Sequence, residues 1–202
     1  MQAWSVLLAG LAMLSSAAAR IDDYPAAHEF AITSLTGKFQ ASGSAAGSPF
    51  DAALQITLNY TMDPAAAEGE TVDTICNLGW DKAEGPGPTN WTLCDTPAVQ
   101  WRLPSEGWSS THNFHVDVFQ TTDYNGAGLY GTHGLIVSPG NRSNPDAYLS
   151  CIQMGKYQPD TCTINGALSA HMGSVIMPAE PRAKKPSYQI KSVGMVGLLS
   201  EK

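Results

Sequence analysis

The stretch Ala52-Ala-Leu-Gln-Ile-Thr-Leu-Asn-Tyr60 decides the fold class, because its larger apolar side chains occupy every second position. These apolar side chains are Leu54, Ile56, Leu58 and Tyr60. Successive side chains of a strand point to opposite faces, so a period of two is typical of a strand with one buried face. The pattern predicts a half-buried β-strand over residues 52–60, with Asn59 on its outward face.

Similar stretches recur along the chain, separated by clusters of glycine, proline and serine. Strands are predicted over residues 29–35, 52–60, 112–119, 129–137, 147–154 and 164–177. Turn or loop clusters lie at 41–49, 83–89, 104–111 and 138–145. The segment Asp123-Tyr-Asn-Gly126 has the residues of a hairpin turn. Many short strands with turns between them predict an all-β fold, an antiparallel β-barrel or sandwich.

The four cysteines form two local pairs, with 17 residues between Cys76 and Cys94 and 10 between Cys151 and Cys162. Four cysteines allow three pairings. We expect the two local disulfides, because each pair can bridge neighbouring strands or tie one hairpin. A zinc site would favour closely spaced C-x2-4-C pairs, which the sequence lacks.

The first 19 residues resemble a signal peptide, with an apolar run over 4–14 and a small-residue site before Arg20. The apolar run is too short for a membrane anchor, which needs about 20 residues. Three glycosylation sequons begin at Asn59, Asn90 and Asn141. Together these features predict a secreted, extracellular glycoprotein.

The remaining chain is expected to form one β-barrel domain over residues 20–178, followed by a basic, proline-containing linker and tail over 179–202. Residues 1–181 contain six Lys and Arg against 17 Asp and Glu, whereas residues 182–202 contain five against one. An acidic body argues against nucleic-acid binding. The tail is either a solvated end or a contact for an anionic surface. Its segment Tyr188–Leu199 is either an edge strand or loosely held.

Catalytic and metal-binding patterns are weak. His112 and His115 lie three apart on a predicted strand, so their rings diverge, whereas His115 and Asp117 share a face and could pair. The nucleophile motif G-x-S-x-G is absent. Asp117 and Asp123 are available as carboxylates, but nothing marks them as an acid–base pair. We therefore expect no enzyme, metal or cofactor.

Four tryptophans lie within a short central region, at Trp80, Trp91, Trp101 and Trp108. Such rings fill barrel cores or cap loops, and they also serve as interface platforms. The polar loop around Trp108 is an unusual place for a core ring. Trp101, Arg102 and Trp108 are therefore the candidate recognition surface.

The chain resembles the Alternaria major-allergen-like proteins, which are small secreted β-barrel proteins of filamentous fungi. The resemblance covers residues 30–177, most of the expected mature chain. It rests on the strand Phe30-Ala-Ile-Thr-Ser-Leu-Thr-Gly37, the segment Trp91-Thr-Leu-Cys94, the spacing of the four cysteines, and Thr163-Ile-Asn-Gly-Ala-Leu-Ser-Ala-His171. The resemblance implies the same two local disulfides and an antiparallel barrel.

The chain lacks the early cysteine that links two subunits in the founding allergen, so no covalent dimer is expected. Family members without that cysteine are similar to fungal elicitors, which are associated with plant cell death, defence induction and binding to host defence proteins. The resemblance therefore implies a secreted, non-catalytic effector or elicitor that binds a host defence protein or a cell-surface component. The alternatives are a carrier of a small apolar or phenolic ligand and an unrecognised secreted hydrolase.

Overall fold

The computed structural model of this chain describes residues 28–39, 52–66, 69–80, 87, 89–155 and 158–186. Its strands are β1 (His28–Phe39), β2 (Ala52–Thr61), β3 (Thr71–Trp80), β4 (Thr92–Leu93), β5 (Val99–Arg102), β6 (Asn113–Thr121), β7 (Gly128–Ile136), β8 (Leu149–Gln153), β9 (Asp160–Ile164) and β10 (Val175–Arg182). The expected signal peptide and the segment Tyr188–Leu199 lie outside these residues. No helix in the described ranges is long and apolar enough to cross a membrane.

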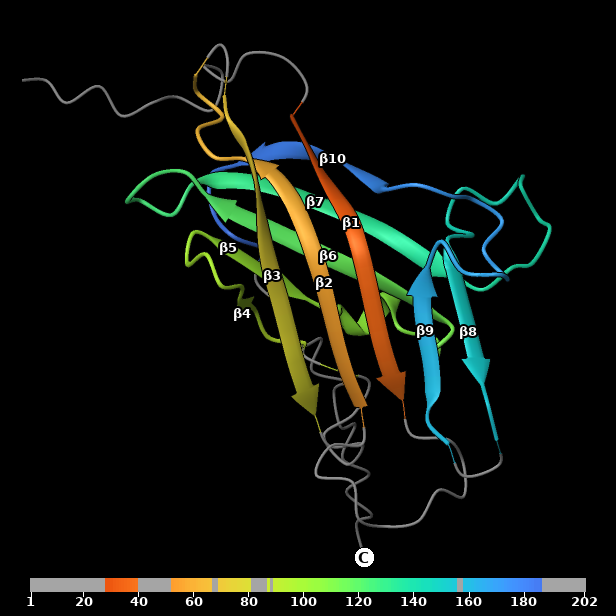
Figure 1. Cartoon of the computed structure of the whole chain (residues 1–202). Coiled ribbons are helices and arrows are strands. Elements are labelled where there is room, and N and C mark those ends of the chain that lie inside the picture. The colour runs from red at the N-terminus through yellow and green to blue at the C-terminus, as the bar shows by residue number, and fades with distance from the viewer. Residues whose placement is uncertain are drawn as a thin grey trace, which may run out of the picture.

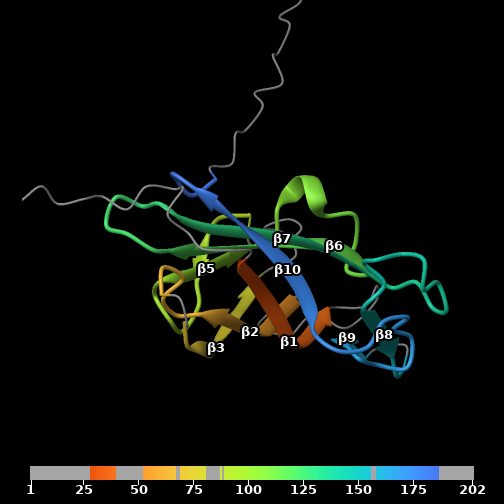
Figure 2. The same cartoon turned by 90° about the horizontal axis from the view of Figure 1, so that it is seen from above.

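The strands form one antiparallel sheet with the order β3-β2-β1-β10-β7-β6-β5-β4. The hairpin of β8 and β9 branches from this path, because β9 pairs with the second half of β1. In Figure 1 the strands β1, β2 and β3 run across β5, β6 and β7, and Figure 2 shows the two groups as separate layers. The sheet is thus a nearly closed barrel, and the predicted all-β fold is confirmed.

A disulfide joins the two ends of the sheet path. Cys76 lies in β3, the first strand of the path, and is bonded to Cys94, directly after β4, the last strand. Beside this bond the backbone N–H of Asp95 donates to the carbonyl of Ile75 at 2.8 Å. The seam between β3 and β4 is therefore held by a covalent bond and by hydrogen bonding.

The second disulfide, between Cys151 and Cys162, lies within the branching hairpin. These two cysteines are directly opposed in the register of β8 and β9. Both predicted pairings are confirmed, one as a bridge between strands far apart in the sheet order and the other as a tie within a hairpin.

The alternation predicted for residues 52–60 is the burial pattern of β2. Its apolar side chains are at most 3% exposed and face the barrel interior: Leu54, Ile56, Leu58 and Tyr60. Period-two patterning therefore predicted this strand and its face correctly.

Strand β1 reverses its inward face at a bulge. Its register against β2 shifts between Ile32 and Ser34. Phe30 and Ile32 are buried before the shift, and Leu35 and Phe39 are buried after it. An extra residue in one strand bends it and changes the parity of its side chains. The bulge lets one strand fill the interior along its whole length while it passes from β10 to β9.

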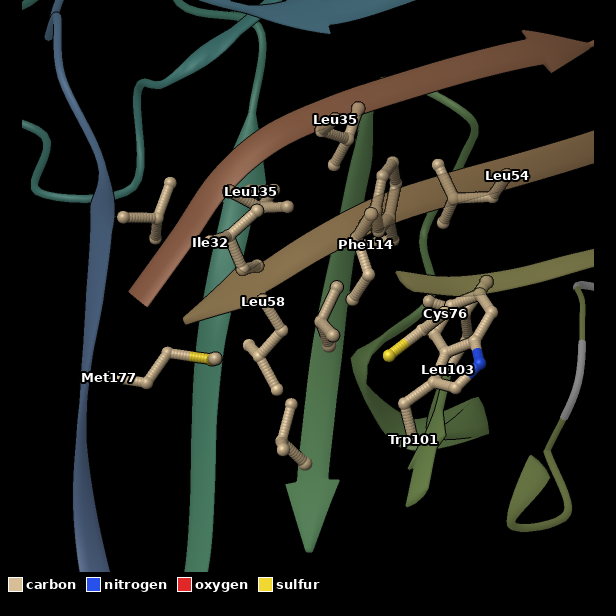
Figure 3. Close-up of a cluster of buried hydrophobic side chains, with 14 of the residues drawn as sticks. Ile32, Leu35, Leu54, Leu58, Cys76, Trp101, Leu103, Phe114, Leu135 and Met177 are labelled. Carbon is tan, nitrogen blue, oxygen red and sulfur yellow. The ribbon is translucent and has the colours of Figure 1, made fainter. Parts of the chain in front are cut away.

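The barrel interior is filled by large apolar side chains. Figure 3 shows a cluster drawn from both layers, with Ile32, Leu54, Trp101, Phe114 and Met177 among its labelled members. All five are at most 1% exposed. Apolar burial of this kind contributes roughly 1.5–3 kcal/mol for each side chain.

Two sequence-based boundaries are wrong. The predicted strand over 164–177 is interrupted, because β9 ends at Ile164 and β10 begins at Val175. Between them the backbone turns, with φ of 62° at Asn165 and 101° at Gly173. The linker predicted from residue 179 begins instead as strand, since β10 continues to Arg182 and pairs with β7. Pro181 is tolerated because it lies near the end of the ladder.

Candidate functional site

A polar and aromatic cluster lies on the outer face of β5, β6 and β7. Val116 and Val118 of β6 point into the barrel, so the alternating residues Asp117 and Phe119 point outward. The register places Arg102 of β5 opposite Asp117. Outward-facing residues of a barrel are normally wet, yet Asp117 and Phe119 are 2% and 1% exposed. Something must therefore cover this face.

The centre of the cluster is a buried ion pair. Arg102 Nε and Nη2 lie 2.9 and 2.8 Å from Asp117 Oδ2, and the two side chains are 5% and 3% exposed. The third guanidinium nitrogen, Nη1, is buried and has no hydrogen-bond partner among the residues that the structure describes. Arg102 also lies against the ring of Trp91, with Cζ at 4.7 Å from the ring centroid. A buried charge is stable only when it is paired, so each partner needs the other.

Tyr130 of β7 extends the cluster. Burial raises the pKa of its hydroxyl, and the nearby Asp117 carboxylate raises it further by charge repulsion and by accepting a hydrogen bond from it. The hydroxyl is therefore a neutral donor at physiological pH. The guanidinium of Arg182, at the end of β10, lies 5.7 Å from the Tyr130 ring centroid.

The ring of Trp91 covers this face, because it lies 4.7 Å from Arg102 Cζ and meets the Phe119 ring edge-on at 6.0 Å. A short segment that follows β10, residues 183–186, contacts Trp91 in turn, and we call it the C-terminal strap. Lys185 Nζ donates to Gln100 Oε1 at 2.6 Å and lies 5.8 Å from the Trp91 ring centroid. Trp91 Nε1 donates to the carbonyl oxygen of Pro186 at 2.8 Å. The strap thus contacts Gln100 and the Trp91 ring, which itself lies against the ion pair.

The arrangement combines an indole ring, a guanidinium, a phenol and an amide on one side of the sheet. The carboxylate of Asp117 already binds Arg102 and Tyr130. Rings with cations beside them are suited to recognition of peptides or other ligands through stacking and hydrogen bonds. We call Trp91, Gln100 and Arg102 the Trp91 platform.

One member of the recognition surface predicted from sequence, Trp101, is fully buried and points into the barrel. Arg102 points to the outer face, where the Trp91 ring lies against it and its exposure is 4%. Their strand, β5, spans only four residues, too few for its alternation to be recognised in the sequence. The member of the cluster that the predicted surface left out is Trp91, which precedes β4 and is half-buried.

Trp108 is part of an aromatic group at one end of the barrel. It follows a short 3-10 helix, Ser105–Gly107, and stacks on Phe114 with 5.5 Å between ring centroids. Phe39 and Trp80 meet it edge-on at 6.5 Å. Trp108 therefore packs against the core and is half-buried, and its recognition role stays a prediction.

One histidine lies beside the hairpin disulfide. A ring nitrogen of His112 and the sulfurs of Cys151 and Cys162 all lie within 4.8 Å of one another. The sulfurs are bonded to each other and offer no thiolate, which is the form that binds metals. His112 contacts the carboxylate of Asp160 instead. The pairing considered for His115 and Asp117 does not form, since Asp117 binds Arg102.

A second group of histidines was not indicated by any motif. His133 Nδ1 lies 3.7 Å from Asp146 Oδ1, and its ring meets Tyr148 edge-on at 5.8 Å. The ring of His171 lies 5.2 Å from the same tyrosine. His171 also contacts the carbonyl oxygen of Asn144 at 2.7 Å. These contacts tie the loops around β8 to β7.

The outer face of β1, β2 and β3 carries an open groove with a volume of about 440 Å³. Its lining includes Thr36, Lys38, Gln55 and Asn77. The groove lies outside the barrel, because these positions alternate with the buried ones on the same strands.

The sequons differ in exposure. Asn90 and Asn141 are exposed, whereas Asn59 is half-buried on the outward face of β2. The Asn59 amide nitrogen, the atom that would carry a glycan, donates to Asp73 Oδ1 at 2.9 Å.

Comparison of the chain with known protein families, with curated proteins and with solved structures finds no match.

Proposed function

We propose that the protein is secreted and acts as a non-catalytic, elicitor-like binding protein that contacts a host defence protein or a cell-surface component. The observation that carries this proposal is the location of its recognition chemistry. The interior is filled by apolar side chains, while Trp91, Arg102 and Tyr130 gather on the outer face. A partner would therefore meet these residues from outside the barrel.

Two further features support the proposal. The two disulfides suit an oxidising compartment and hold the seam and the hairpin against unfolding. The Asp117 carboxylate of the cluster is engaged by Arg102 and accepts a hydrogen bond from Tyr130, which suits a structural role. The elicitor role itself comes from the resemblance in the cysteine frame.

The test is infiltration of plant leaves with the purified, disulfide-intact protein, with scoring of oxidative burst and necrosis. A reduced and alkylated sample serves as the unfolded control. The variant Trp91→Leu removes the ring of the platform, and Met154→Ala removes an exposed apolar side chain on the β8–β9 hairpin as a matched control. We expect a response to the native protein and to the Met154 variant only. No response to the native protein at micromolar dose would overturn the proposal.

A second candidate function is transport of a small apolar or phenolic ligand, favoured by the groove on β1–β3. Its volume of about 440 Å³ falls in the range of small-molecule sites, roughly 300–1,000 Å³. A ligand that binds only the folded protein raises its melting temperature by mass action. A thermal-shift screen of phenolic compounds, repeated on an Asn77→Arg variant that obstructs the groove, tests this function.

A further inference from the structure

We propose that the Trp91 platform is a binding site for an extended lysine-proline segment of a partner polypeptide, and that the C-terminal strap is the chain's own occupant of that site. This inference rests on the proposed function, because it names the chemistry of the partner that the outer face would recognise.

The strap shows which chemistry fits the platform. Its lysine ammonium lies against the Trp91 ring and donates to Gln100 Oε1. Its proline carbonyl accepts the indole N–H at 2.8 Å. An ammonium over an indole face is a favourable cation–π contact, and indole is the best of the aromatic rings for it. A lysine followed by a proline thus satisfies three groups of the platform together.

The strap is held more weakly than the strand that leads to it. The ladder between β10 and β7 ends at Arg182, so residues 183–186 have no strand pairing. Ala183 and Lys184 are exposed, and the strap's contacts to the platform among the described residues come from Lys185 and Pro186. Segments with few buried contacts open locally at low cost. A partner segment can therefore replace the strap while the barrel remains folded.

One group of the platform is left unsatisfied by the strap. Within the described part of the chain, Arg102 Nη1 is buried and has no hydrogen-bond partner. Buried donors are normally paired, and an unpaired one is a cost that an added acceptor removes. A partner segment with one more carbonyl oxygen near Arg102 would bind better than the strap does.

Charge favours the same partner. The chain up to residue 181 has six Lys and Arg against 17 Asp and Glu, whereas residues 182–202 have five against one. An acidic surface attracts basic segments and speeds their encounter. Because the strap is part of the same chain, its effective concentration at the platform is high, and it competes with any partner segment.

The experiment uses the intact chain and a fluorescently labelled peptide, Arg-Ala-Lys-Lys-Pro-Ser, which has the sequence of residues 182–187. Lys185→Ala weakens the strap, and Lys184→Ala removes an equal charge from an exposed neighbour without a contact to Trp91. We expect the peptide to bind the Lys185 variant at least about tenfold more tightly than the Lys184 variant or the unaltered chain. A peptide with alanine at its second lysine should lose that binding.

Two substitutions in the Lys185→Ala background assign the binding to the platform. Trp91→Leu should abolish peptide binding, and Trp91→Phe, which keeps a smaller aromatic ring and loses the N–H donor, should weaken it severalfold. Circular dichroism and the melting temperature establish that each variant is folded. If Trp91→Leu unfolds the chain, the peptide affinity of Trp91→Phe tests whether the peptide binds at the platform. Equal binding to the Lys185 and Lys184 variants, or binding unaffected at Trp91, would overturn the inference.

If two copies of the chain exchange their straps, the fraction of dimer should increase with protein concentration, and the dimer should be absent in the Lys185→Ala variant. That result in sedimentation analysis would overturn the assignment to a foreign partner. If the peptide does not bind but the leaf response is retained, only the inference of a lysine-proline site is overturned. If the peptide binds but leaves do not respond, the proposed function is overturned and the binding site is supported.

Discussion

Cys76 and Cys94 join β3 and the end of β4, the two strands that stand furthest apart in the order of the sheet. Their disulfide is therefore the covalent closure of the barrel. Beside it, the N–H of Thr96 donates to Thr74 Oγ1 at 3.1 Å. The bond closes a short loop in the sequence and a long path around the sheet.

Removal of this disulfide should therefore loosen a specific seam. We expect Cys76→Ala/Cys94→Ala to lower the free energy of unfolding by about 3 kcal/mol, from the loop entropy that the bond removes from the unfolded chain. Hydrogen exchange at the amides of Asp95 and Thr96 should also accelerate, because both amides donate across the seam. Urea denaturation and exchange mass spectrometry measure the two effects.

The hairpin disulfide provides the control. Cys151→Ala/Cys162→Ala should cost a comparable free energy, since its loop is of similar length, but should leave the amides of Asp95 and Thr96 protected. Equal acceleration of these amides in both variants would contradict the assignment of the Cys76–Cys94 bond to closure.

The buried ion pair predicts a large effect from a single substitution. Arg102→Met leaves the Asp117 carboxylate buried and unpaired, and should cost about 3–5 kcal/mol of stability. Adding Asp117→Asn removes the charge and keeps an acceptor for Tyr130, so the double variant should recover part of that loss. Urea denaturation of the single and double variants measures it.

The control for this prediction is Arg182→Met. That arginine pairs with Glu180 at the surface, with 49% of its side chain exposed. Exposed pairs contribute about 0–1 kcal/mol, so its loss should be small. A similar loss at both arginines would show that the Arg102 effect does not come from a buried charge.

The raised pKa of Tyr130 predicts a decline of stability at alkaline pH. Its hydroxyl keeps its proton to a higher pH in the folded protein than the ordinary value of 10.0 in the unfolded chain. Stability from this group is therefore complete below pH 10 and is lost as pH rises through the higher folded pKa. Tyr130→Phe should flatten this part of the profile in denaturation measured from pH 8 to 11.

Absorbance at 295 nm offers a direct titration of the same hydroxyl. The difference between the unaltered chain and Tyr130→Phe should show a transition above pH 10, because burial and the Asp117 carboxylate disfavour the phenolate. A Tyr130 transition at or below the ordinary value of 10.0 would contradict this account.

Local patterning predicted the elements whose signals are local. The alternation in β2 and the turn residues between β6 and β7 each lie within ten residues, and both were correct. The cysteine pairing was also predictable, because both disulfides join cysteines that are neighbours in the sequence. The bulge in β1 was not, since it depends on registers with two neighbouring strands.

The candidate site could not be read from the sequence for the same reason. Arg102 and Asp117 are 15 residues apart and meet through strand register. Trp91 and Pro186 are 95 residues apart and meet only because β10 returns beside β7. An arginine and an aspartate on outward positions are ordinarily solvated, so nothing in the pattern indicated that the Trp91 ring would lie against the arginine of this pair.

Substitution of alanine for either of two glycines in β7 should lower stability by different amounts. A methyl group at Gly128 would lie 2.0 Å from the backbone oxygen of Gln120, in the paired strand β6. A methyl group at Gly134 would lie 2.5 Å from Asp146 Oδ2, the tip of a side chain that can rotate away. Gly128→Ala must therefore separate the end of the β6–β7 ladder, whereas Gly134→Ala must only move a carboxylate.

Because overpacking against a fixed backbone costs typically 1–3 kcal/mol, we expect that loss of stability at Gly128 and a loss of roughly 1 kcal/mol or less at Gly134. Urea denaturation measures both losses, and faster hydrogen exchange near Gln120 should accompany only the first. Equal losses at the two positions would contradict the difference between a fixed and a movable neighbour.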